Sequence, residues 1–192
     1  MTPFLNTTTN RRVNPLDLQP EDVNLTDIAH ALALCNRFAG HTIRPISVAQ
    51  HSVWVSLMCD NGTDYEIPMA ALLHDASEAY LGDVTKWLKM SPDMKAYRDA
   101  EKRATRVILH TFNCYDGLVE AVEEADKRMV CWEAERGIKN FFDHTMPEGY
   151  GPVKGPWRSV LQRDWVWQEW YDAEITFRDR FLVLQSRKSY VH

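Results

Sequence analysis

Apolar residues recur every three to four positions along most of this chain, which is the spacing of one face of an α-helix. One such stripe contains Ile28, Leu32 and Cys35, and another near the C-terminus contains Phe177 and Phe181. No segment has a convincing alternation of apolar and polar residues, the pattern of a half-buried strand. The pattern therefore predicts an all-α fold, a helical bundle of five to seven helices.

Capping and stop signals locate the ends of these helices. Thr26 and Ser47 are expected to begin helices, because a side-chain oxygen at the N-cap accepts a hydrogen bond from a free backbone N–H. Pro68 suits the first turn of a helix, and Gly40 and Gly82 suit the position after the last turn. The expected helices span residues 26–39, 47–58, 68–81, 93–112, 116–137 and 164–184.

Two segments lack helical periodicity. Residues 1–23 are polar and contain three prolines, which predicts an extended N-terminal arm or loop. Residues 140–163 contain three prolines and three glycines among aromatic residues, which predicts a long loop of the kind that often carries function. With 192 residues, 45% of them hydrophobic, the chain is expected to form a single domain, 1–192, with a substantial core.

Charge and composition narrow the partners and the compartment. A net charge of −5 is a poor match for a nucleic-acid backbone, although a small phosphorylated ligand needs only a few local cations. The longest useful apolar run, residues 67–73, is far shorter than the roughly 20 residues of a membrane span. The four cysteines form no CxxC pair, and the N-terminus lacks the apolar stretch of a signal peptide. We therefore expect a cytoplasmic protein that binds neither a membrane nor a nucleic-acid polymer; if the chain is phage-encoded, the cytoplasm is that of the host.

Polar side chains interrupt two of the apolar stripes. His51 stands between Val48 and Val55 at helical spacing, and Asp126 follows Val122 in the same way. An ionised carboxylate in a protein interior is costly unless it is paired, hydrogen-bonded or bound to a metal ion. Each residue alone has a simpler explanation, since His51 can be a hydrogen-bonded core histidine and Asp126 can pair with a buried arginine.

A third helix adds two more candidate ligands. His74 and Asp75 directly follow the apolar run Ala70–Leu73, so they enter the buried part of that helix. Four nitrogen and oxygen ligands from three helices suit a divalent transition metal, because imidazole with carboxylate favours Zn, Fe, Mn or Co over calcium. Glu78 lies one turn further on the same face, where a carboxylate can orient or deprotonate a water molecule, or can simply be a surface glutamate.

The order His51, His74-Asp75 and Asp126 resembles the H…HD…D signature of the HD-domain metal-dependent phosphohydrolases. The resemblance is closest to the bacterial 5′-deoxynucleotidases and their phage relatives, including the phage-type dATP triphosphohydrolases. The run HDASE-x-x-x-GD is much more specific than the HD pair alone. The matching segments are CNRF, HTIRPISVAQHS, HDASEAYLGD and EADKR, within roughly residues 25–135.

The resemblance assigns roles to individual residues. It implies that the metal ligands are His51, His74, Asp75 and Asp126, and that Glu78 and Asp83 are the acidic residues that serve hydrolysis. The expected cofactor is a divalent ion, Zn, Co or Mn, with Mg as a further possibility.

Substrate-binding residues follow from the same resemblance and from nearby positive charge. In the family an arginine and an aromatic residue, commonly tryptophan, precede the first ligand and contact phosphate and nucleoside. Arg37 and Phe38 occupy that place here, and phenylalanine keeps the capacity to stack on a ring. Arg44, Lys86 and Lys89 are the other cations near the motifs, and we expect them to bind phosphate groups.

The expected activity is metal-dependent cleavage of the 5′ O–P bond of a deoxynucleotide. The phage-like HTIRPIS segment and its extra cation favour dATP as the substrate and deoxyadenosine as the product. The alternatives are a 5′-deoxynucleotidase acting on deoxynucleoside monophosphates, a nucleotide-binding HD module without turnover, and a helical interaction protein in which the motif is accidental. The resemblance also implies a homo-oligomer.

Overall fold

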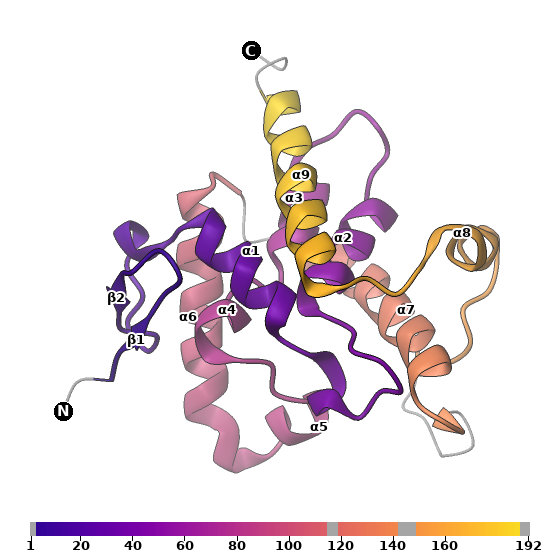
Figure 1. Ribbon diagram of the computed structural model, residues 1–192, viewed down its shortest axis with the longest axis horizontal. Helices are drawn as coiled ribbons and strands as arrows, with labels where there is room; N and C mark the ends of the chain where they lie inside the picture. The colour runs from indigo at the N-terminus through magenta and orange to yellow at the C-terminus, as the bar shows by residue number, and fades with distance from the viewer. Residues whose placement is uncertain (1–2, 115–118, 142–148, 189–192) are drawn as a thin grey trace.

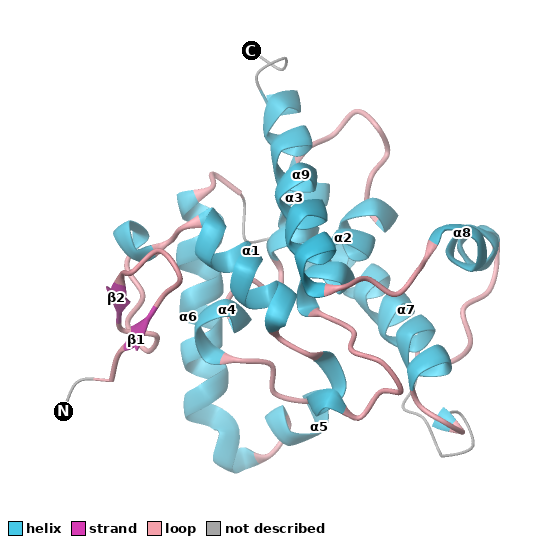
Figure 2. Cartoon of the chain, viewed as in Figure 1, coloured by secondary structure: helices cyan, strands magenta, loops and turns pink. Residues whose placement is uncertain are grey.

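The computed structural model describes residues 3–114, 119–141 and 149–188 of the chain. These residues form a predominantly helical structure with one small antiparallel hairpin, which confirms the all-α class (Figures 1 and 2). Over these ranges there are seven α-helices of at least eight residues, at the upper end of the expected number, and α4 and α5 are single turns. The elements are β1 Leu5–Asn6, β2 Arg12–Val13, α1 Leu25–Leu34, α2 Val48–Met58, α3 Glu66–Leu73, α4 Glu78–Leu81, α5 Lys86–Lys89, α6 Lys95–Thr111, α7 Val119–Gly137, α8 Pro156–Asp164 and α9 Trp170–Lys188.

Hydrogen bonds at the helix ends show which of the expected N-cap residues cap a helix in the structure. Ser47 caps α2 as expected, through its side-chain oxygen. Asn24, rather than Thr26, caps α1, because its side-chain oxygen accepts hydrogen bonds from the backbone N–H groups of Thr26 and Asp27. α1 also ends at Leu34, several residues earlier than expected, and the chain then enters a short 3-10 turn. The expected start of α7 at residue 116 lies outside the described residues.

The helix expected over residues 68–81 is broken in its middle. α3 ends at Leu73, and the next four residues form successive turns before α4 begins. The backbone N–H of Ala76 donates to the carbonyl of Leu73, and that of Glu78 donates to the carbonyl of Asp75, so the chain is wound at three residues per turn. This tighter winding changes the directions of the side chains in the HDAS segment.

Both segments expected to be irregular contain more structure than the prediction allowed. In the N-terminal arm, Leu5 pairs with Val13 across a hairpin, and Val13 and Leu18 are buried, so residues 3–23 pack against the helices. The expected loop 140–163 contains most of α8, whose Leu161 is fully buried. Residues 142–148 of that loop lie outside the described residues. α9 correspondingly begins at Trp170 and not at residue 164.

Helices α2 and α3 lie at the centre of the structure. One hydrophobic cluster joins α1, α2, α3, α6 and α9, and a second joins α2, α3, α7 and α8. Eight of the eleven residues of α2 are buried. The polar residues Gln50, His51, Ser52 and Ser56 of α2 are therefore buried, whereas His74 and Asp75 after α3 are partly exposed. In Figure 1 the ribbons of α2 and α3 lie among those of the other helices. In the described part of the chain no helix combines the length and the apolar character needed to cross a membrane.

Hydrogen bonds among charged side chains connect α9 to the C-terminal end of α2. Arg180, which is buried, donates from Nε to Oγ of Ser56 at 2.9 Å and from Nη2 to Oδ2 of Asp60 at 2.7 Å. Arg187 donates to Oδ1 of the same carboxylate at 2.8 Å. Burial raises the pKa of Asp60, but the hydrogen bonds from Arg187, from the backbone of Gly62 and from Arg180 outweigh it and lower the pKa to about 2.

Asp60→Asn is expected to lower the free energy of unfolding by about 1.5–3 kcal/mol, the range for hydrogen bonds to charged groups. The pKa of Asp60 is lower in the folded state than the ~3.9 of an unfolded chain, so its contribution is complete above about pH 4 and is lost as pH falls towards 2. Urea unfolding of both proteins between pH 7 and pH 2 measures this. The difference should shrink over that acid window, whereas Asp179→Asn, at an exposed position of α9, should behave like wild type.

Candidate metal centre

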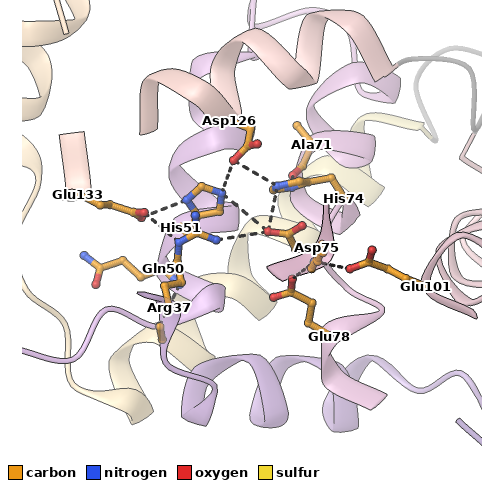
Figure 3. Close-up of polar contacts among 12 residues, drawn as sticks. Arg37, Gln50, His51, Ala71, His74, Asp75, Glu78, Glu101, Asp126 and Glu133 are labelled. Carbon is orange, nitrogen blue, oxygen red and sulfur yellow. Dashed lines mark hydrogen bonds and ion pairs between the residues drawn. The ribbon is translucent and has the colours of Figure 1, made fainter. Parts of the chain in front are cut away.

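The four predicted ligands lie close together (Figure 3). His51 comes from α2, His74 and Asp75 from the turns after α3, and Asp126 from α7. Nε2 of His51 lies 3.0 Å from Oδ1 of Asp126 and 3.9 Å from Oδ2 of Asp75. Nε2 of His74 lies 3.2 Å from Oδ2 of Asp75 and 4.0 Å from Oδ1 of Asp126. The ligand atoms of His51, His74 and Asp126 all lie within 4.8 Å of one another.

The two imidazole rings present the same nitrogen to this point. Nδ1 of His74 lies 2.7 Å from the carbonyl oxygen of Ala71, and Nδ1 of His51 lies 3.1 Å from Oε1 of Glu133. Each contact favours a ring proton on Nδ1, so Nε2 is the nitrogen that a metal ion would engage once it is deprotonated. Both Nε2 atoms are buried and have no hydrogen-bond partner of good geometry. Two orphaned imidazole nitrogens facing two carboxylates fit a divalent transition metal.

The negative charges of the cluster raise the pKa values of both histidines. Burial by itself lowers the pKa of His74, but Asp75 and Asp126 outweigh it and raise the pKa to about 9. The pKa of His51 is also raised: burial and Arg37 lower it, and Glu133 and Asp126 more than compensate. Metal ligands must be deprotonated, so an ion binding here displaces protons from both histidines.

Glu78 lies beside the ligands and is buried, not exposed as the surface alternative required. Its Oε1 accepts a hydrogen bond of 3.2 Å from Nζ of Lys89, and its Oε2 is buried without a hydrogen-bond partner. Burial, followed by the negative charge of Asp75, raises the pKa of Glu78 to about 9. The protonated form of Glu78 is therefore favoured, and one of its oxygens is unengaged beside the four candidate ligands.

A cavity of about 440 Å³ opens over this cluster. Asp83 lines it, and burial raises the pKa of that carboxyl group. A wider and more open hollow of about 600 Å³, lined by residues 149–157 with Arg128 and Cys131, contains none of the predicted site residues. The cavity over the cluster is lined by eight of the predicted site residues: Arg37, Phe38, Asp75, Glu78, Asp83, Lys86, Lys89 and Asp126.

Arg37 and Phe38 reach the cavity through a strained turn. Phe38 and Ala39 have φ values of 57° and 51°, in the left-handed region, and Gly40 follows at 76°. Side chains other than glycine rarely adopt this conformation, which clusters at functional sites. Nε of Arg37 donates to Oε2 of Glu133 at 2.9 Å, and Nη1 lies 3.4 Å from Oδ2 of Asp75.

The predicted cations differ in where the structure places them. Nζ of Lys86 donates to the hydroxyl of Tyr150 at 2.6 Å, and Lys89 is shared between Glu78 and Glu101. Arg44 is exposed and does not line the cavity over the cluster. The position of Arg44 therefore does not support its expected role in binding phosphate.

Glu133 is a member of the site that the sequence analysis did not identify. It is completely buried and contacts both His51 and Arg37 (Figure 3). One signal was available, because Glu133 follows Asp126 by seven residues, or two helical turns, and so lies on the same face of α7. Its contacts with His51 and Arg37 join segments far apart in the sequence, so the spacing of residues along α7 cannot predict them.

Sequence comparison relates the chain to proteins without an assigned role. It is 34% identical over 117 residues to the uncharacterized protein YfdR of Escherichia coli, which covers 60% of this chain and 62% of YfdR. It is 37% identical over 103 residues to an uncharacterized protein of Rhodobacter capsulatus, with 51% and 52% covered. The chain thus spans between about half and three-fifths of the length of these relatives. No protein-family model matches the chain.

Proposed function

We propose that this protein is a divalent-metal-dependent phosphohydrolase that cleaves the 5′ O–P bond of deoxynucleotides. The observation that carries the proposal is the convergence of His51, His74, Asp75 and Asp126 beside a cavity that also holds the unengaged oxygen of Glu78. The resemblance to the HD-domain phosphohydrolases supports the same chemistry.

The chain's own residues supply positioning and proton transfer. A divalent ion held by the four ligands would polarise a phosphoryl oxygen and lower the pKa of water. Glu78 is placed to exchange a proton through Oε2, and Lys89 holds its other oxygen. Asp83 lines the same cavity and can share that proton exchange. The unused N–H groups of Arg37 and the ammonium of Lys86 can bind phosphoryl oxygens there.

The walls of the cavity favour a ligand with an anionic part and a flat apolar part. Alongside the charged groups, Phe38, Trp87, Phe141 and Tyr150 contribute aromatic surface. Trp87 is 57% exposed, so its ring is accessible to a ligand. A phosphate needs cations, and a nucleobase stacks on aromatic rings at about 1–3 kcal/mol per base. A nucleotide satisfies both requirements.

The positions of the cations favour a deoxynucleoside monophosphate over the dATP expected from the sequence. A triphosphate brings about four negative charges and needs cations beyond the α-phosphate. Arg44 does not line the cavity, and Lys89 already contacts two carboxylates. Lys86 and Arg37 suffice for one phosphoryl group.

A substrate panel tests the proposal. The protein is incubated with all dNMPs, dNTPs and rNTPs in the presence of Mn, Co, Zn or Mg, and the products are separated by chromatography. Release of deoxynucleosides and phosphate from dNMPs supports the proposal in its monophosphate form. Deoxyadenosine from dATP alone would establish the triphosphate form. No turnover by metal-loaded protein would refute hydrolysis and leave a nucleotide-binding module, and a failure to bind any metal would leave an interaction protein.

Phe38→Ala is expected to raise KM about 5- to 100-fold, the loss of one base–aromatic stack, or to change the preference among bases. Metal content should stay at the wild-type level, because the ring of Phe38 lines the cavity but has no atom that can bind a metal ion. Steady-state kinetics on each dNMP measure this. Phe4→Ala, which removes an exposed ring from the N-terminal segment, is the matched control. An unchanged KM and base profile would remove Phe38 from the substrate pocket.

A further inference from the structure

The carboxylate of Glu133 joins two functional groups that come from different parts of the chain. Its Oε1 lies 3.1 Å from Nδ1 of His51 and its Oε2 lies 2.9 Å from Nε of Arg37. All three side chains are buried, and His51 and Glu133 have no exposed surface. Figure 3 shows Glu133 on the far side of the imidazole ring from the cluster formed by Asp75, His74 and Asp126.

A carboxylate in this position determines which ring nitrogen of His51 carries the proton. An ionised carboxylate accepts hydrogen bonds and donates none, so it favours Nδ1–H and leaves Nε2 free to face the other ligands. Outer carboxylates of this kind fix the tautomer and the ring orientation of metal-binding histidines, and their removal costs about 10- to 100-fold in metal affinity.

The second oxygen of Glu133 holds Arg37 in the same way. Nε is the guanidinium nitrogen bonded to the aliphatic part of the side chain, so a hydrogen bond at Nε helps to fix the plane of the group. Nη1 then points towards Oδ2 of Asp75 at the edge of the cavity. One carboxylate thus orients both a candidate metal ligand and a candidate phosphate-binding group.

This inference rests on the metal centre proposed above. We propose that Glu133 is a positioning residue with two effects. It keeps His51 in the Nδ1–H form that binds metal through Nε2, and it orients Arg37 towards the same site. Glutamine at this position has nearly the same shape but only one acceptor oxygen. Its NH₂ group must face a donor of either His51 or Arg37, and on the His51 side it stabilises the tautomer with a proton on Nε2.

Glu133→Gln is expected to weaken binding of Zn²⁺ and Mn²⁺ by metal-free protein about 10- to 100-fold, measured by competition with a chromophoric chelator. At saturating metal it should also raise KM more than it lowers kcat, because Arg37 loses its fixed orientation. Glu135→Gln is the control, since Glu135 lies on the same helix and pairs instead with Arg158. A metal affinity within threefold of wild type would refute a positioning role and make Glu133 a purely structural partner of Arg37.

A second measurement needs no variant to fold. In wild-type protein loaded with Zn²⁺, NMR should detect the Nδ1–H proton of His51 as a downfield signal protected from solvent exchange, because it is buried against Glu133. A His51 ring protonated at Nε2, or a rapidly exchanging Nδ1–H, would overturn the inference. The chelator competition and the NMR signal do not depend on turnover, so a protein that binds metal as expected but hydrolyses no deoxynucleotide refutes the proposed function and not the role of Glu133.

Discussion

Asp126→Ala is expected to reduce hydrolysis to background and to lower metal affinity by more than about 100-fold. Asp126 is the one ligand that comes from α7, and its Oδ1 lies closer to Nε2 of His51 than any other carboxylate oxygen of the cluster. Loss of even an outer residue of a metal site costs about 10- to 100-fold, and the loss of a direct ligand exceeds that. Metal content by elemental analysis and phosphate release from the active substrate measure the two effects.

The control for Asp126→Ala is available on the same helix. Glu124→Ala removes an exposed carboxylate that pairs with Arg128 on the surface of α7, and it should leave metal content and rate at the wild-type level. Circular dichroism measures helix content and so separates loss of metal from loss of fold. The variant is expected to stay folded, because the buried residues Met129 and Trp132 still anchor α7. If Asp126→Ala kept full metal content and full rate, the ligand set would be wrong.

The positions that local spacing determines were predictable from the sequence. His51 stands between Val48 and Val55 at helical spacing, and it is fully buried as that pattern indicated. The start of α2 at Ser47 depends on a single hydrogen bond between residues three apart. The burial of a helix face and the start of a helix depend on residues close together in the sequence, so a short segment is enough to predict them.

The positions that depend on distant contacts were not predictable in this way. The break after Leu73 occurs within a segment whose apolar spacing predicts one continuous helix, although His74, Asp75 and Ser77 are only moderate helix formers. Glu133 looks like one more charged residue on α7 until Arg37 and His51 are placed against it by other parts of the chain. The left-handed turn at Phe38 and Ala39 is likewise one that the residue types do not favour.

For Glu78, the sequence and the structure supply different kinds of evidence for the same role. The resemblance to HD-domain phosphohydrolases implies that Glu78 serves hydrolysis, and its burial and unengaged Oε2 give a physical reason. Burial and the charge of Asp75 favour its protonated form. A divalent cation held beside Asp75 would oppose this by neutralising its charge, and so would favour a Glu78 that can both take and return a proton.

Glu78→Gln is therefore expected to lower kcat by about 10²- to 10⁴-fold, the usual share of acid–base catalysis, with metal content near the wild-type level. Glutamine keeps an acceptor oxygen for Lys89 but has no titrating proton, so the limb of the pH–rate profile that reports Glu78 should disappear. Kinetics between pH 5 and 10 and elemental analysis measure both effects. Glu101→Gln, which alters the other carboxylate that contacts Lys89, should retain that limb and most of the rate. Loss of metal and of the folded structure together in Glu78→Gln would instead make Glu78 a structural residue.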